Sequence, residues 1–271
     1  MVRKNVLIIF IFLVLGCQTS DDDTQLDFIN EIPAVNSEDN LNEESSTTMK
    51  SFDREQMLTF IVSQIIIPSF DNLDMNLGEL KTSFNLFNGA ITEENLTDLR
   101  NKWLDAYKAW QSVEMFNIDK AMEGYYLFKS NTYPVDTTRV KTNIENGTYD
   151  LENPNNYSAQ GFPTIDYLLY GLDNDSSKVI NHFRDNTKNR DYLGAIIGAL
   201  VDNTKDIKDN WKTVKDEFVK STENTASSNL NMMVNDFIYY YEKGFRAHKF
   251  GIPGGVFSSG ALPDKVEGYY S

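Results

Sequence analysis

The strongest constraint on the fold is a regular spacing of large apolar residues in the segment 96–113. The spacing alternates between three and four residues through Leu96, Leu99, Trp103, Ala106, Trp110 and Val113. Residues three and four apart share one face of an α-helix, so these side chains form a single apolar stripe. A stripe with this spacing is typical of the seam between antiparallel helices.

Comparable stripes cover most of the chain after residue 50, and together they predict an all-α antiparallel helical bundle. They comprise Leu58, Ile61, Val62, Ile65 and Ile66, then Leu73, Leu77, Leu80, Phe84 and Phe87, then Leu193, Ile197, Leu200, Ile207, Trp211, Val214 and Phe218, and finally Leu230, Met233, Phe237, Tyr240 and Tyr241.

Several residues predict where these helices begin, bend or end. Asp53 and Thr92 have side chains that can cap a helix N-terminus. Pro68 lacks the backbone N–H and is expected to kink or break the first helix. We expect residues 119–160 to be irregular apart from a short helix over residues 136–146.

The N-terminus predicts export and attachment to a membrane. Residues 1–16 have the basic start and short apolar core of a signal peptide, and the apolar run is shorter than the roughly 20 residues that span a bilayer. Val14 to Cys17 resembles a bacterial lipobox, which implies cleavage before Cys17, lipidation of its thiol and a membrane partner reached through the lipid anchor. Cys17 is the only cysteine, so an intramolecular disulfide cannot form.

An acidic, polar segment follows the lipobox. Ser20 to Asp23 resembles the export signal that sends lipoproteins of Bacteroidetes-type bacteria to the cell surface, and it can equally serve as a solvated tether. Residues 17–50 contain few apolar residues, so we predict a disordered, acidic linker. The formal net charge of the chain is -15, which excludes a nucleic-acid partner and favours attraction of cations.

One short segment combines strong hydrophobicity with a single acid. Between Gly161 and Gly171, Ile165, Leu168 and Leu169 fall on one helical face, whereas Asp166 points off that face. Asp166 could meet a metal ion or a basic partner. It could also be an ordinary polar position that is bonded to a nearby side chain or to water.

This segment resembles the signature of the imelysin family, which is Gly-x-His-x-x-Glu followed by Tyr-Leu-Leu. Gly161, Tyr167, Leu168 and Leu169 match, whereas Pro163 occupies the histidine position and Asp166 the glutamate position. The family consists of bacterial envelope proteins and includes peptidase-classified and iron-uptake-associated members. The resemblance implies that residues 51–271 form the first bundle of an imelysin-like fold, either truncated at the C-terminus or lacking the second bundle.

The resemblance also suggests partners for Asp166. Glu114 follows the tryptophan-containing helix and could share a divalent cation or iron with Asp166, because carboxylates are hard oxygen ligands. A solvent-facing position is the alternative for Glu114. Arg246 could neutralise an acid of this site, or it could simply lie at the end of its helix, where positive charge is favourable.

Three functions remain compatible with the sequence. A surface lipoprotein could bind a cation or small ligand in iron acquisition, with envelope iron-uptake or other surface proteins as partners. A non-catalytic interaction scaffold could retain the bundle without a metal site. A metallopeptidase is disfavoured because Pro163 has no donor atom and because His182 and His248 lie outside any zinc motif, so no catalytic residue is assigned.

Overall fold

The computed structural model describes residues 52–258 and residue 260, which belong to a compact unit spanning Ser51–Ser271. The predicted signal peptide, Cys17 and the linker lie outside the described residues. Every regular element within the described part is helical, as predicted. In chain order the elements are α1 (Arg54–Ile61), η1 (Val62–Ile66), α2 (Ile67–Gly89), α3 (Glu93–Trp110), α4 (Lys120–Glu123), α5 (Tyr126–Asn131), α6 (Thr137–Asn146), η2 (Pro154–Ala159), α7 (Gly161–Tyr170), α8 (Ser176–Asp185), α9 (Thr187–Phe218), α10 (Asn229–Tyr239) and η3 (Tyr240–Gly251).

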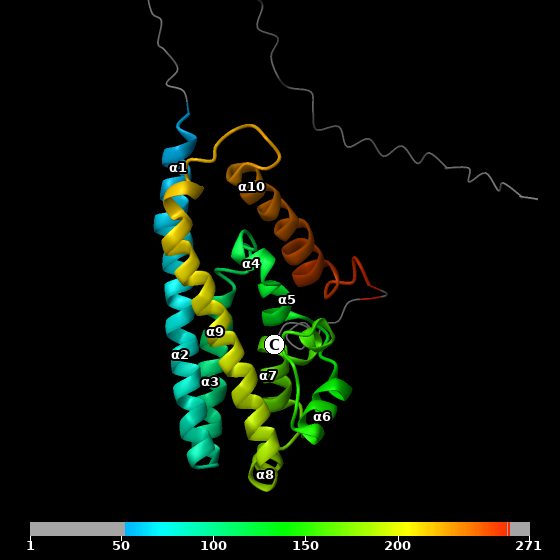
Figure 1. The fold of residues 1–271 in the computed structure, drawn as a ribbon. Coiled ribbons are helices and arrows are strands. Elements are labelled where there is room, and N and C mark those ends of the chain that lie inside the picture. Colours follow the sequence, from blue (N-terminus) through cyan, green and yellow to red (C-terminus); the bar gives the residue numbers. More distant parts are fainter. Residues whose placement is uncertain (1–51, 259, 261–271) are drawn as a thin grey trace, which may run out of the picture. The chain divides into compact units, whose positions relative to one another are not determined.

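Three long helices form the bundle. The α2 helix runs antiparallel to α3 after a tight turn, and α9 packs along α2 (Figure 1). The stripes of α2, α3 and α9 lie in this core, with only Val214 of α9 half-buried. In the stripe over residues 58–66, Leu58, Val62 and Ile66 are buried, but the prediction is wrong for Ile65, which is exposed. Burial of these apolar faces supplies the main driving force for assembling the bundle. No described helix has both the length and the apolar character needed to cross a membrane.

The predicted helix starts are confirmed by hydrogen bonds. The side chain of Asp53 accepts from the backbone N–H of Gln56 at 2.9 Å, and that of Thr92 accepts from Asn95 at 3.2 Å. These bonds satisfy donors that lack a partner inside the helix. The short helix predicted over residues 136–146 is present as α6, and Gly147 ends it with φ of 68°.

Pro68 was predicted to kink or break the first helix, and it does not break it. The chain remains helical from α1 through α2, with the wider π-helical turn η1 directly before the proline. Pro68 is the second residue of α2, and because it has no backbone N–H it donates no hydrogen bond to the preceding turn. A π-turn accommodates the proline ring by shifting the hydrogen-bond pattern of the preceding turn.

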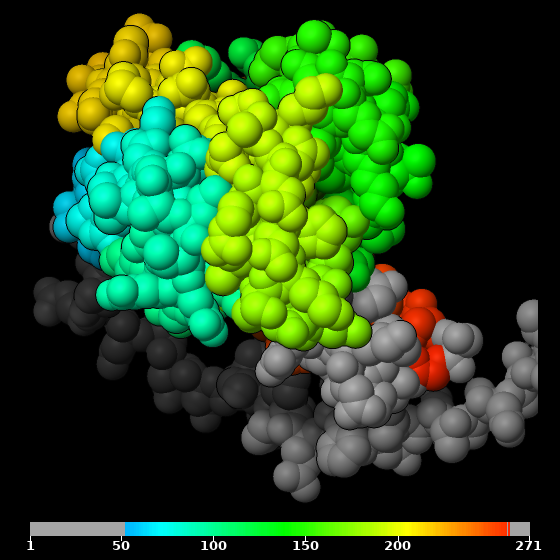
Figure 2. Space-filling view, turned by 90° about the horizontal axis from the view of Figure 1, so that it is seen from below, coloured from blue at the N-terminus to red at the C-terminus, as the bar shows by residue number. Residues whose placement is uncertain are grey.

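The segment 119–160 is more ordered than predicted, since it contains α4, α5, α6 and η2. It is held by scattered buried apolar residues such as Val140 and by buried polar groups. The buried Asn143 donates to Asn156 and to the Tyr192 hydroxyl of α9, at 3.1 Å in both cases. In Figure 2 the α6 region, α8 with the start of α9, and the end of α2 are seen together from below.

The C-terminal helical run consists of α10 and η3 and lies beside the bundle (Figure 1). The prediction that its apolar stripe is core is wrong for two residues: Leu230 is buried, but Phe237 and Tyr241 are about half exposed. Most of this run therefore contacts the bundle along one narrow side. That side forms a wall of the cavity described below.

Gly161 allows a close approach between α7 and α5. Its φ is 78°, and a Cβ atom at this position would lie 2.3 Å from the carbonyl oxygen of Ser130. Only glycine adopts this conformation without strain and without a collision. The glycine of the signature therefore fixes how α7 enters the core.

We expect Gly161→Ala to lower the free energy of unfolding by about 3 kcal/mol or more, through backbone strain and collision with Ser130. The matched control is Gly198→Ala, since an added Cβ at this helical position meets nothing within 4 Å. The control should stabilise the protein by about 0.5 kcal/mol. Urea unfolding measures both changes, and equal effects would contradict this role of Gly161.

Candidate functional site

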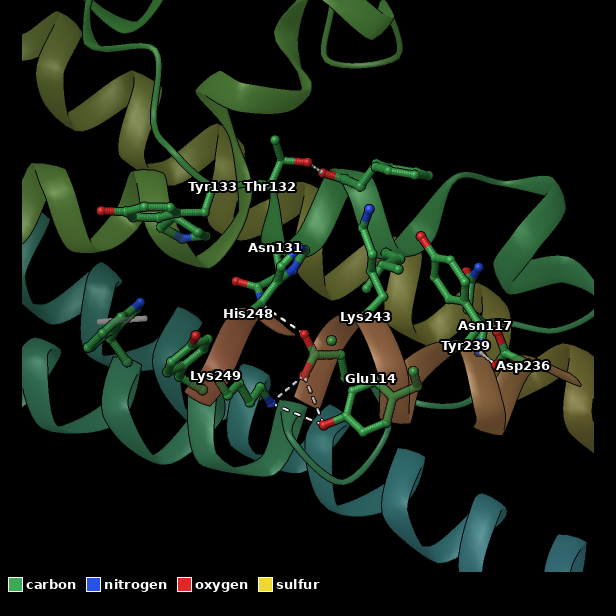
Figure 3. A pocket seen from close by; sticks show the side chains of 17 residues that line it. Glu114, Asn117, Asn131, Thr132, Tyr133, Asp236, Tyr239, Lys243, His248 and Lys249 are labelled. Atoms are coloured by element: carbon green, nitrogen blue, oxygen red, sulfur yellow. Dashed lines mark hydrogen bonds and ion pairs between the residues drawn. The ribbon is translucent and has the colours of Figure 1, made fainter. Parts of the chain in front are cut away.

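A cavity of about 240 Å³ lies between the bundle and the C-terminal helical run. The walls come from the end of α3 and the turn after it, from α5 and the residues after it, from the start of α7, and from α10–η3 (Figure 3). The lining residues are Trp103, Tyr107, Glu114, Asn117, Leu127, Phe128, Asn131, Thr132, Tyr133, Pro163, Asp236, Tyr239, Tyr240, Lys243, Gly244, His248 and Lys249.

Aromatic rings make up much of the wall on the bundle side. Trp103 and Tyr107 stack with ring centroids 5.5 Å apart, and Tyr107 also contacts Phe162 of α7 at 5.3 Å. The indole N–H of Trp103 donates to the Phe162 carbonyl at 3.1 Å, which fixes this wall against α7. Burial and then the charge of Glu114 raise the pKa of Tyr107, so its phenol stays neutral.

Glu114 and Lys249 form a largely buried ion pair at one side of the cavity. The Lys249 ammonium donates to Glu114 at 2.7 Å, to the Tyr240 hydroxyl at 3.1 Å and to Gln111, while Asn131 donates to the other Glu114 oxygen at 3.1 Å (Figure 3). Burial lowers the pKa of Lys249, but the interactions with Glu114 and Tyr240 outweigh it and leave the pKa raised. The pair therefore remains ionised and joins η3 to α3.

Arg246 does not neutralise an acid of the cavity, contrary to the sequence-based expectation. It pairs with Glu242 one helical turn earlier, at 2.5 Å, and both side chains are about half exposed. Its guanidinium also lies 5.4 Å from the ring centre of Phe257.

Asp166 lies on the bundle side of α7 near Arg100 and does not line the cavity. Arg100 donates to the Leu169 carbonyl at 3.0 and 2.6 Å and to Ser176 at 2.9 Å, and it stacks on Tyr170. No described residue forms a hydrogen bond with the Asp166 carboxylate. Burial raises the pKa of Asp166 to about 6, although the nearby Arg100 charge lowers it.

The signature frame reaches the cavity through Pro163. Its ring lines the wall at the position where the family motif has histidine, whereas Gly161 is buried under α5 and Tyr167 packs against the core. The frame is thus present, but proline contributes no ligand atom. Among the described residues, no group of three or more His, Cys, Asp or Glu side chains is placed to hold a metal ion.

Two polar residues of the cavity had no role in the sequence-based prediction. Asp236 accepts from the backbone N–H of Asn117 at 2.8 Å, and burial raises its pKa to about 6 despite that bond. Lys249 is the partner of Glu114. The basic residues between positions 246 and 249 predicted a positive charge near the end of the helix. Only the tertiary structure shows that Lys249 is the one that pairs with Glu114.

The fold and site define an all-helical bundle protein with a small, aromatic-walled cavity. A family model described as imelysin matches residues 66–271, so the chain belongs to the imelysin family. Among relatives, "Iron-regulated protein A" of Synechococcus elongatus is 25% identical over 115 residues, which are 42% of this chain and 31% of that protein. The chain thus matches about a third of that relative.

Two solved structures share the fold. An imelysin-like protein from Psychrobacter arcticum 273-4 superposes with a TM-score of 0.59 and 19% identity over 77% of this chain and 65% of that one. A protein described as a putative iron-regulated protein A precursor from Parabacteroides distasonis ATCC 8503 superposes with a TM-score of 0.55 and 12% identity. The match covers 76% of this chain and 58% of that one. This chain spans less than two thirds of either structure.

We expect Lys249→Met to destabilise the protein by about 3 kcal/mol, because the buried Glu114 carboxylate loses its charged partner. Arg246→Met is the matched control, since its ion pair is exposed, and should cost less than about 1 kcal/mol. Urea unfolding of both variants tests the assignment. The double variant Glu114→Gln/Lys249→Met should regain much of the loss, and no recovery would argue against the pair.

The raised pKa of Asp166 makes stability depend on pH. Between the ordinary aspartate pKa near 4 and the folded value of about 6, the folded state binds the extra proton, so stability falls as the pH rises. Asp166→Asn removes this loss. The free energy of unfolding of the variant, relative to that of wild type, should therefore be higher at about pH 8 than at about pH 4, by up to about 3 kcal/mol.

Urea unfolding at both pH values measures the effect of Asp166→Asn. The exposed variant Asp202→Asn controls for the change in net charge. A difference from wild type that is the same at both pH values would mean that the Asp166 carboxylate is not penalised by burial.

Proposed function

We propose that this chain is a lipid-anchored protein of the bacterial outer membrane and is exposed at the cell surface. We further propose that it binds a small organic ligand in the α3–α5–η3 cavity and that this binding contributes to iron acquisition. The cavity is the observation that carries this proposal. Ligand sites are typically concave and mainly apolar with a few placed polar groups, and the cavity has this composition. The lipobox ending at Cys17 and the acidic run after it support the location.

The link to iron comes from the names of two similar proteins, both iron-regulated. Binding of a small organic ligand does not require that the protein itself coordinate a metal ion. Glu114 is already bound by Lys249 and Asn131, and Pro163 offers no donor. A cation held between Asp166 and Glu114 is the less favoured form of the proposal, because a cation would have to displace Lys249.

Metal analysis distinguishes these two forms of the proposal. The purified protein is incubated with ferrous, ferric or zinc ions, separated from free metal and analysed beside Asp166→Ala. We expect no stoichiometric metal in either sample. Metal that is retained by wild type and lost in Asp166→Ala would favour the cation site, and chelator-sensitive cleavage of a protein substrate would favour a peptidase.

An interaction scaffold is the second candidate, and one observation favours it. The side of α10–η3 that faces away from the cavity exposes large apolar side chains: Val234, Phe237, Ile238, Tyr241 and Phe245. A contiguous apolar surface of this kind often marks a contact with another polypeptide. A scaffold of this type would need this surface and would tolerate filling of the cavity, whereas a ligand-binding protein would not.

We expect Thr132→Trp to abolish ligand binding by filling the cavity. Thr142→Trp is the matched control, because both threonine hydroxyls donate to the carbonyl four residues earlier, at 2.7 and 2.9 Å, but only Thr132 lines the cavity. A thermal-shift screen of small organic acids, amines and zwitterions on all three proteins provides the measurement. Ligands that stabilise Thr132→Trp as strongly as wild type would contradict the proposed cavity.

A further inference from the structure

We infer that the cavity selects a small zwitterion whose ammonium and carboxylate groups are separated by an apolar, ring-bearing spacer. This inference rests on the proposed function, because it names the ligand class of the same cavity. It follows from which polar groups around the cavity already have protein partners, which do not, and where the latter lie.

The Glu114–Lys249 pair contributes little to ligand charge recognition. All three hydrogens of the Lys249 ammonium have acceptors, in Glu114, Gln111 and Tyr240, and both Glu114 oxygens accept hydrogen bonds. The opposite charges also cancel at short range. The remaining charged groups of the lining are Lys243 and Asp236.

Lys243 is the donor end of the cavity. Its ammonium has no hydrogen-bond or ion-pair partner among residues 52–258, and Figure 3 shows it directed into the cavity toward α5. His248 is close enough for Lys243 to contribute to its lowered pKa, after the larger effect of burial. Both Lys243 and His248 line the cavity, and both can donate a hydrogen bond to a ligand carboxylate.

Asp236 is the acceptor end. One of its oxygens accepts from the backbone of Asn117, which leaves the other oxygen available. The side-chain oxygen of Asn117 is buried without a hydrogen-bond partner in the described structure. A buried acceptor without a donor is costly, and a ligand ammonium entering between Asp236 and Asn117 would supply donors to both.

The two ends are separated along one helical run. Asp236 lies in α10 and Lys243 lies seven residues further on, in η3; both line the cavity, and they are separated by on the order of 10 Å along the axis of the run. Figure 3 shows Asp236 and Lys243 at different places along the cavity, with Tyr239 nearer the Asp236 end. In an α-amino acid the ammonium and carboxylate groups are attached to the same carbon, so they cannot reach both ends of the cavity. A spacer that contains a ring can separate the two groups and pack against the aromatic wall.

The inference is tested with 4-(aminomethyl)benzoate, a rigid zwitterion with its charges at opposite ends of a ring. Its single-charge analogues are 4-methylbenzoate and 4-methylbenzylamine, and phenylalanine is the zwitterion with closely spaced charges. Calorimetric titration of the purified protein should show the zwitterion binding at least about tenfold more tightly than each of the other three.

Two variants assign the ends. Asp236→Asn should reduce binding of 4-(aminomethyl)benzoate by about tenfold and leave 4-methylbenzoate unchanged, and Lys243→Met should do the same with 4-methylbenzylamine unchanged. Asp216→Asn and Lys215→Met, exposed residues of α9 outside the cavity, are the matched controls. Thermal unfolding confirms that each variant is folded.

Each outcome bears on the inference. Equal affinity for the zwitterion and either single-charge analogue, or no binding of the zwitterion, overturns it. The proposed function survives that result if another ligand from the thermal-shift screen stabilises wild type and not Thr132→Trp. If no ligand in the screen distinguishes those two proteins, the proposed function fails as well.

Discussion

The site depends on a buried ion pair between two elements that are far apart in the sequence. Glu114 follows α3, and Lys249 lies near the end of η3, which has few other buried contacts with the bundle. A buried carboxylate without a cation is strongly unfavourable, so the pair determines how the C-terminal run approaches the bundle. The cavity is the space that this approach leaves between aromatic side chains and the helical run.

The segment from Gly161 to Gly171 contributes packing to the fold, and none of its residues contributes a metal ligand to the cavity. Gly161 retains the close contact with α5, and the apolar face of α7 is buried. Pro163 lines the cavity wall, and Asp166 lies outside the lining beside Arg100. The contacts of Gly161 and of the buried face of α7 thus hold the segment in the bundle without any metal ligand.

Periodicity predicted the bundle well because burial of an apolar stripe leaves a direct signal in the sequence. The capping residues Asp53 and Thr92 were also predictable, since a cap is a local interaction. Of the short elements between residues 119 and 160, α6 was predicted, whereas α4, α5 and η2 were missed because none is longer than six residues, which is too short to show a helical apolar period. Pro68 was misjudged because the π-turn that accommodates it has no sequence signature.

The sequence by itself determined the helical class, most of the core stripes and the absence of a donor at Pro163, because each depends on residue type and local spacing. Only the tertiary structure decided the partners in the site. It assigned Lys249 to Glu114 and Arg246 to Glu242, and it brought Asp236 to Asn117. These choices depend on the rotation and placement of α10–η3 against the bundle, which long-range packing sets and no local pattern encodes.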